Sequence, residues 1–201
     1  MEQVIEYLDE LFPNPKCELN YTKDYELLIA VVLSAQTTDK KVNIVTSQLF
    51  NKYPTLKDLS EANIEDIKYI IKIIGTHNKK ASFIKDIATI LLEKYGGIVP
   101  NNFKDLESLP GVGHKTASVV LSNLYNIPAF AVDTHVSRVA KRLGFTSVDD
   151  SVEIVEKKMK DLLPNYKWGR THHQLVLFGR YKCKAVKPEC ENCKLKNICN
   201  R

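Results

Sequence analysis

Residues 109–116 read LPGVGHKT, a proline followed by two glycines that flank one apolar residue, and then a lysine. Pro110 ends the preceding helical turn, whereas Gly111 and Gly113 permit positive φ angles and let the backbone approach another molecule closely. A new helix begins near Lys115, so main-chain N–H groups point outward from its N-terminus, where a phosphate oxygen binds readily. The stretch therefore predicts two helices joined by a tight hairpin that contacts phosphate.

A nucleotide-binding P-loop is the competing interpretation of these residues. Its pattern is G-x-x-x-x-G-K-[ST], but His114 rather than glycine precedes Lys115, and no strand leads into the loop. The P-loop is thereby excluded. What remains is a helix-hairpin-helix, a clamp for the DNA backbone that does not depend on base sequence, and we expect Gly111, Gly113 and Thr116 to contact DNA.

Helical periodicity extends over nearly the whole chain on both sides of the hairpin. In residues 63–75, Asn63 caps the start, isoleucines recur on one face, and Gly75 supplies a left-handed stop. A second helix is expected over residues 79–95, closed by two glycines. Further helices are predicted over residues 1–12, 24–35, 39–51, 103–108, 115–125, 134–143, 151–162 and 169–181. Because no alternating strand pattern and no internal repeat is found, the predicted fold class is all-α.

The composition is that of an ordinary globular protein, with 44% hydrophobic and 26% charged residues in a chain of 201. The first eight residues carry acids where a secretory leader carries positive charge, and the longest apolar run, Leu27–Leu33, is too short to span a bilayer. We therefore expect a cytoplasmic monomer without membrane contact, associated with the nucleoid if it binds DNA.

The net charge of +5 is concentrated at the end of the chain. Residues 179–201 hold seven basic and two acidic residues, whereas the rest of the chain is neutral, with 22 of each. Such a run is either a solvated face or a patch that faces phosphate, because clustered cations release condensed counterions from DNA.

Two residues near the hairpin have both a structural and a chemical interpretation. Lys115 is either a solvated or phosphate-contacting residue of a first helical turn, or an amine nucleophile, which must be neutral when it attacks. Asp133 is suited to cap the helix over 134–143. A carboxylate beside a sugar undergoing bond cleavage also stabilises oxocarbenium character or assists proton transfer. Their separation in sequence does not show that the two residues meet.

Four of the five cysteines are crowded near the C-terminus with the spacing Cys-x6-Cys-x2-Cys-x5-Cys, at positions Cys183, Cys190, Cys193 and Cys199. In a cytosolic protein this pattern indicates a metal site more than disulfides. Four thiolates suit zinc and an iron–sulfur cluster equally well. The fifth, Cys17, is expected to be a packing residue.

The hairpin, Asp133 and the cysteine cluster, in that order, strongly resemble the endonuclease III family, the iron–sulfur DNA glycosylase/lyases of base-excision repair. The resemblance covers essentially the whole chain, including LSAQ at residues 33–36, and the cysteine spacing is its most specific element. It implies a [4Fe–4S] cluster rather than zinc on the four cysteines. It also implies a six-helix barrel domain over residues 18–128, a discontinuous cluster domain of residues 1–17 and 129–201, and a DNA-binding cleft between them.

The resemblance further implies a substrate, double-stranded DNA with damaged bases or abasic sites, and a bifunctional reaction. Lys115 would attack the anomeric carbon of the deoxyribose and form a Schiff base, Asp133 would assist departure of an oxidised pyrimidine, and β-elimination would nick the strand. Adenine-excising relatives and some mismatch-specific relatives lack a lysine at this position. Gln36 would fill the space left by the flipped base, and Lys184 and Lys187 in the cysteine loop would contact phosphate.

One departure from the family pattern concerns the residues after the helix over 63–75. The family often places a large apolar wedge after an Ile-Gly pair, where this chain has Ile74, Gly75 and Thr76. Ile74 is the remaining candidate for a DNA wedge, since Thr76 is a poor intercalator. Two other functions are compatible with the pattern: a monofunctional glycosylase for mismatched or deaminated bases, and a non-catalytic DNA-binding protein with a zinc-stabilised tail.

Overall fold

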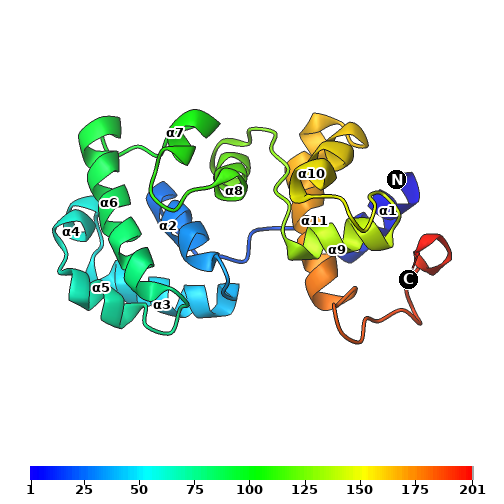
Figure 1. The fold of residues 1–201 in the computed structure, drawn as a ribbon, viewed down its shortest axis with the longest axis horizontal. Coiled ribbons are helices and arrows are strands. Elements are labelled where there is room, and N and C mark those ends of the chain that lie inside the picture. The colour runs from blue at the N-terminus through cyan, green and yellow to red at the C-terminus, as the bar shows by residue number, and fades with distance from the viewer. Residues whose placement is uncertain (201) are drawn as a thin grey trace. The chain divides into compact units, whose positions relative to one another are not determined.

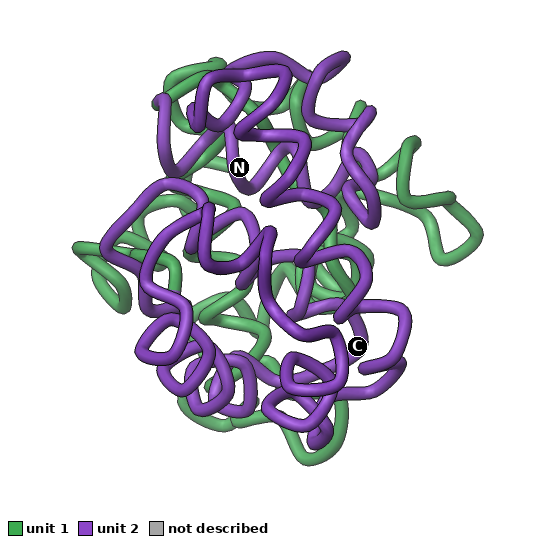
Figure 2. Tube along the Cα trace, turned by 90° about the vertical axis from the view of Figure 1, so that its left-hand side faces the viewer, with its two compact units in different colours: residues 1–17, 126–201 green, residues 18–125 purple. Residues whose placement is uncertain are grey.

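The computed structural model describes residues 1–200 and divides the chain into two compact units. Unit 2 is Glu18–Tyr125, and unit 1 combines Met1–Cys17 with the chain from Asn126 onward, as the colours in Figure 2 show. Every regular element within the described residues is helical, so the prediction of an all-α fold is confirmed (Figure 1). None of these helices is both long enough and apolar enough to cross a membrane.

Unit 2 is built around one helix that is buried on all sides. Its helices are α2 (Asp24–Ser34), α3 (Asp39–Lys52), α4 (Leu56–Glu61), α5 (Ile64–Ile70), α6 (His77–Tyr95), α7 (Phe103–Glu107) and α8 (His114–Tyr125). Residues 25–33 of α2 are all buried, and α3, α6 and α8 pack against this helix. A helix that is apolar all round lies inside a core, so the run Leu27–Leu33 forms the centre of unit 2.

Unit 1 joins the two ends of the chain through α1 (Glu2–Leu11), which packs against α11 (Trp168–Tyr181). Arg170 on α11 pairs with Asp9 on α1 at 2.6 Å, and Gln174 donates to the same carboxylate at 2.7 Å. The remaining elements are α9 (Thr134–Arg142), α10 (Val152–Asp161) and the 3-10 turns η1 (Asn165–Lys167) and η2 (Lys196–Ile198). Their apolar faces enclose a core of buried aliphatic residues around Phe130 and Leu8.

The helix predicted over residues 63–75 is shorter than expected. Asn63 caps it through a hydrogen bond from the Glu65 N–H at 2.9 Å, as predicted, but α5 ends at Ile70. The left-handed residue that follows is Thr76, with φ of +57°, and not Gly75, so the prediction of a glycine stop is wrong. By contrast Gly96, the predicted end of α6, is left-handed with φ of +59°.

Candidate functional site

The hairpin between α7 and α8 is tight because its first glycine packs directly against an aromatic ring. Gly111 has φ of +74°, and a Cβ atom placed on it would lie 2.4 Å from Cδ2 of Phe83. Leu109 and Val112, on either side of it, are buried, and the Val112 N–H donates to the Leu109 carbonyl at 3.1 Å. Gly113 has open space around it and its φ is not positive. Only the first glycine is therefore required by the local packing.

The exposed side chain of His114 contacts α7 and stabilises the hairpin. Its ring stacks on Phe103, with centroids 4.9 Å apart and planes inclined by 14°. Its Nδ1 lies 2.9 Å from Oε1 of Glu107, the last residue of α7. The two ends of the connection are thus held together by one imidazole at the first position of α8.

Lys115 and Thr116 occupy the first turn of α8, directly after the hairpin. The Lys115 side chain is exposed and that of Thr116 is half-buried. The first N–H groups of a helix have no partner within the helix, so this turn presents donors and the positive end of a helix dipole next to an accessible amine. The backbone donors of this turn can bind an anion, and the amine beside them can attack an electrophile.

Asp133 is the N-cap of α9, in unit 1, and this prediction is confirmed. Its Oδ1 accepts the Val136 N–H at 2.8 Å, and the residue is half-buried. The cap fixes the carboxylate in one orientation, while the exposed part of the side chain stays open to solvent. Lys115 and Asp133 thus belong to different units, each held by the start of its own helix.

Gln36 and Ile74, the two side chains predicted to enter DNA, differ in their exposure. Gln36 follows α2, is exposed, and has φ of +59°. Ile74 is only 1% exposed and belongs to the core of unit 2. Its burial corrects the expectation that its side chain inserts into DNA, because a core isoleucine does not reach a duplex without unpacking. On either side of Ile74, the residues Ile73, Gly75 and Thr76 are exposed.

All five cysteines are thiols in the described structure. Cys183, Cys193 and Cys199 pack against the apolar core of unit 1. Burial raises the pKa of the Cys193 thiol, and negative charge on Cys183, Cys190 and Cys199 raises it further, so a thiolate at Cys193 is disfavoured without a cation nearby. Although residues 1–200 contain no group of metal-binding side chains already drawn together, a cationic cluster would relieve this repulsion. The donor set therefore fits an iron–sulfur cluster.

The backbone of the cysteine loop is held by two arginines that the sequence analysis did not single out. Arg138 donates to the Cys183 carbonyl at 3.2 Å, and Arg142 donates to the Lys184 carbonyl at 2.8 Å and to Sγ of Cys183 at 3.3 Å. Their spacing of four residues places both on one face of α9, and this spacing is the signal that could have identified them.

The two lysines predicted to contact phosphate lie in this loop. Lys184 donates to Oε1 of Glu189 at 2.8 Å, and Lys182 donates to Oε2 of the same residue at 3.0 Å. These two bonds, that of Lys184 first, lower the pKa of Glu189 to about 2. Lys187 is exposed, with φ of +49°. Lys184 must therefore leave or share Glu189 in order to bind a phosphate.

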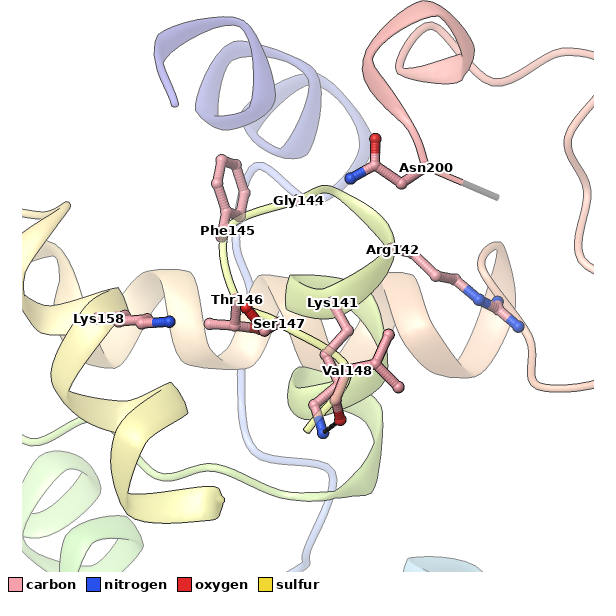
Figure 3. Close-up of a pocket in the computed structure, with 9 residues that line it drawn as sticks. All are labelled: Lys141, Arg142, Gly144, Phe145, Thr146, Ser147, Val148, Lys158 and Asn200. Carbon is pink, nitrogen blue, oxygen red and sulfur yellow. Dashed lines mark hydrogen bonds between the residues drawn. The ribbon is translucent and has the colours of Figure 1, made fainter. Parts of the chain in front are cut away.

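A pocket of about 780 Å³ in unit 1 is lined by none of the residues predicted as site residues (Figure 3). It contains the cations Lys141, Arg142 and Lys158. All three are engaged, because Lys141 donates to the Val148 carbonyl at 2.7 Å, Lys158 pairs with Asp150 at 2.7 Å, and Arg142 holds the cysteine loop. We assign no function to this pocket.

Comparison with known proteins agrees with the hairpin and the fold. The family model of the HhH-GPD superfamily of base excision DNA repair proteins matches residues 29–165. Endonuclease III of Bacillus subtilis (strain 168) is 45% identical over 199 residues, which cover 99% of this chain and 91% of the relative. A solved endonuclease III–DNA covalent intermediate, trapped as an estranged-adenine complex, is 46% identical with a TM-score of 0.94, covering 100% of this chain and 96% of that one.

A thermostable thymine-DNA glycosylase shares the fold at a lower identity, 26%, with a TM-score of 0.86 over 99% of this chain and 94% of its own. The similarity to the endonuclease III proteins is therefore higher, and it extends from end to end of the chain. On these grounds the protein belongs to the endonuclease III family, within the HhH-GPD superfamily of base excision DNA repair proteins.

Proposed function

We propose that the protein is a bifunctional DNA N-glycosylase and abasic-site lyase of base-excision repair that removes oxidised pyrimidines from duplex DNA. The observation that carries the proposal is the accessible amine of Lys115, in the first turn of α8 directly after the hairpin. The solved relative trapped on DNA as a covalent intermediate is 46% identical over the full length of this chain, which supports a covalent route.

In the proposed reaction the neutral amine of Lys115 attacks C1′ of the deoxyribose. A bond forms between Nζ and C1′, the glycosidic bond breaks, and the departing base takes up a proton. The charged Asp133 carboxylate stabilises positive charge that develops on the sugar. Lys115 belongs to unit 2 and Asp133 to unit 1, so each unit supplies one of the two groups.

The second step breaks the DNA strand. The sugar ring opens to give a protonated Schiff base on Lys115, which draws electrons away from C2′. Loss of a proton from C2′ then expels the 3′ phosphate by β-elimination, and water hydrolyses the imine to regenerate the lysine. A glycosylase without an amine nucleophile releases the base but leaves the strand intact.

DNA is held, in this proposal, by backbone donors and by a few side chains. The N–H groups of Gly111 and Gly113, with Thr116, bind phosphate at the hairpin. Gln36, exposed at the end of α2, occupies the space left by the flipped nucleotide. Lys184 and Lys187 bind a further phosphate, and the protein acts as a monomer.

The two units have different tasks in this scheme. Unit 2, which holds the seven helices α2 to α8 and is extended to residue 128, is the barrel domain that carries the hairpin, and residues 1–17 with 129–201 form the cluster domain. The side chains of Cys183, Cys190, Cys193 and Cys199 would hold a [4Fe–4S] cluster. When bound, this group supplies a rigid cross-link for the C-terminal loop, and the bond-making chemistry belongs to Lys115 and Asp133.

The test is a panel of duplexes that each carry one defined lesion, incubated with and without borohydride. We expect base release and strand cleavage together on oxidised pyrimidines, with a covalent complex when borohydride is present. Folded protein that cleaves no lesion duplex and forms no covalent complex would refute the proposal.

A monofunctional glycosylase for mismatched or deaminated bases is the second candidate, supported by the fold shared with a thymine-DNA glycosylase at 26% identity. The same panel separates the two candidates, because a monofunctional enzyme releases base from a mismatch without cutting the strand in the absence of heat or added amines. A non-catalytic protein with a zinc-stabilised tail would instead release no base and contain zinc without iron.

A further inference from the structure

Lys80 is a buried ammonium group to which the proposed reaction gives no task. It lies in the first turn of α6, is 4% exposed, and burial lowers its pKa. No carboxylate pairs with it among the described residues. Its Nζ instead donates to two backbone carbonyls, those of Leu33 at 2.9 Å and Ala35 at 2.6 Å. A buried cation without a counter-ion is costly, so this arrangement needs a reason.

The two carbonyls lie at the C-terminal end of α2. Leu33 is in the last turn of that helix and Ala35 is its C-cap. Carbonyls at this end have no partner within the helix and carry the negative end of the helix dipole, so they form a good receptor for an ammonium group. Lys80 therefore caps α2 from a neighbouring helix, 45 residues away in sequence.

Lys80 connects two turns, and each turn contains an exposed residue with a left-handed backbone conformation. Gln36 directly follows Ala35 and has φ of +59°, and Thr76 precedes α6 with φ of +57°. The Lys80 N–H donates to the Thr76 carbonyl at 3.1 Å, so Lys80 holds one turn by its main chain and the other by its side chain. Residues other than glycine keep left-handed angles only where the surrounding structure holds them.

We propose that Lys80 is a positioning residue, which fixes the Gln36 turn relative to the Thr76 turn so that the Gln36 side chain enters DNA at the flipped nucleotide. The inference rests on the proposed function for the role of Gln36. The proposal also bears on Thr76, which stands where the family often has a large apolar wedge. With Ile74 buried and a short side chain at 76, Gln36 is the longer of the two exposed residues that Lys80 connects, so its placement matters more.

The chain provides a matched control for this role. Lys85, on the same helix, donates from its Nζ to the carbonyl of Ala62 at 2.8 Å, and Ala62 is the C-cap of α4. Lys85 thus makes the same kind of connection to a helix end that bears no proposed DNA contact. Lys80→Met and Lys85→Met each remove one ammonium group and its bonds to a C-terminal helix end.

The experiment is a double-mutant cycle of Lys80→Met with Gln36→Ala, read as the single-turnover rate of base excision from a lesion duplex. A misplacement of about 1 Å can lower a rate by about 100-fold, so we expect each single variant to lose between about tenfold and 100-fold. Because Lys80 acts through Gln36, the double variant should be no slower than the slower single variant. Lys85→Met should excise at the wild-type rate.

Three results would overturn the inference: losses that multiply in the double variant, a normal rate for Lys80→Met, or a normal rate for Gln36→Ala. A loss of rate in Lys85→Met equal to that in Lys80→Met would also overturn it, since the effect would then be one of stability. If Lys80→Met does not fold, Lys80→Arg takes its place in the same cycle, because it keeps the charge but moves the donors. Wild-type protein that releases no base refutes the proposed function and is recognised in the same assay.

Discussion

Asp133 combines two tasks that one substitution can separate. Its Oδ1 caps α9 and its charge, in the proposed reaction, assists departure of the base. Asparagine caps a helix as well as aspartate does but carries no charge. We expect Asp133→Asn to keep the thermal stability of the wild type and to slow base release by about 10²–10⁴-fold, the usual range for a lost acid–base group.

Asp133→Ala is the control, since it removes the cap as well as the charge. It should lower the free energy of unfolding by about 1 kcal/mol, which Asp133→Asn should not. Denaturant unfolding and a single-turnover excision assay measure the two effects separately. An Asp133→Asn variant with a normal excision rate would leave Asp133 as a cap alone.

Individual residues could be predicted from sequence where their role is local. Asn63 and Asp133 were recognised as caps because a cap depends only on the next few residues. The burial of Ile74 agrees with the isoleucines on one face of residues 63–75, but the end of α5 at Ile70 could not be predicted, because it depends on where the chain turns next. Lys80 was missed for a similar reason, since its partners lie in another helix and nothing near it in sequence marks a buried lysine.

At the scale of the secondary-structure elements, the two glycines of the hairpin are expected to differ in their effect on stability. Gly111→Ala places a methyl group against Phe83 and strains a left-handed residue, so we expect a loss of about 1–3 kcal/mol in unfolding free energy. Gly113→Ala meets no neighbour and should change stability by less than about 0.5 kcal/mol. If the backbone of Gly113 approaches DNA, the same variant should bind duplex DNA more weakly.

Unfolding in denaturant and DNA titration of both variants test these expectations. Equal stability of the two variants would show that the contact with Phe83 is readily relaxed. Normal DNA affinity of Gly113→Ala would show that the hairpin backbone does not lie close to the duplex.

The loop from Cys183 to Cys190 yields a prediction about charge. Glu189 binds both Lys182 and Lys184, so Glu189→Gln should release two cations and raise the affinity for DNA. The log–log plot of DNA affinity against salt concentration should become steeper by roughly one unit for each additional phosphate that the protein binds. Because the pKa of Glu189 is lowered to about 2, the wild-type carboxylate loses its charge only near that pH. The difference between variant and wild type should therefore be constant from about pH 5 to pH 9.

Glu191→Gln is the matched control, since it changes the net charge by the same amount close to the same loop. Salt titrations of DNA binding compare the two variants. An equal rise in affinity for both would mean that overall charge, and not release of Lys184, is responsible.

Most helices were predicted from sequence to within about two residues, because each has its own cap and apolar face. The exceptions are α5, which ends five residues earlier than predicted, and α4, Leu56–Glu61, which was not predicted. Its six residues are too few to show a helical period. A signal was present nonetheless, since Thr55 and Asp58 form a capping box in which each side chain accepts the backbone N–H of the other.

For the whole molecule, the cysteine cluster predicts a dependence of stability on metal. Cys193→Ser should lower the iron content and the melting temperature of the purified protein, because three of the four thiols pack against the core of unit 1. Cys17→Ser, outside the spacing, should keep both. Metal analysis with thermal unfolding tests this, and a Cys193→Ser variant with full iron content would exclude Cys193 as a ligand.

The organisation of the whole chain was harder to predict than its parts. The all-α class followed from periodicity, but the pairing of α1 with α11 depends on contacts such as Asp9 with Arg170, 161 residues apart. No local pattern indicates such a contact, and only the family resemblance suggested a discontinuous domain. Likewise, only the family resemblance suggested that Lys115 and Asp133 act on the same sugar.

The central claim is that Lys115 becomes covalently attached to damaged DNA, and borohydride trapping followed by mass spectrometry of the peptides tests it most directly. With a duplex that carries one abasic site, we predict a reduced sugar adduct on Lys115, and no adduct with Lys115→Ala although that variant still binds the duplex. An adduct on another residue, or none from folded wild-type protein, would contradict the account.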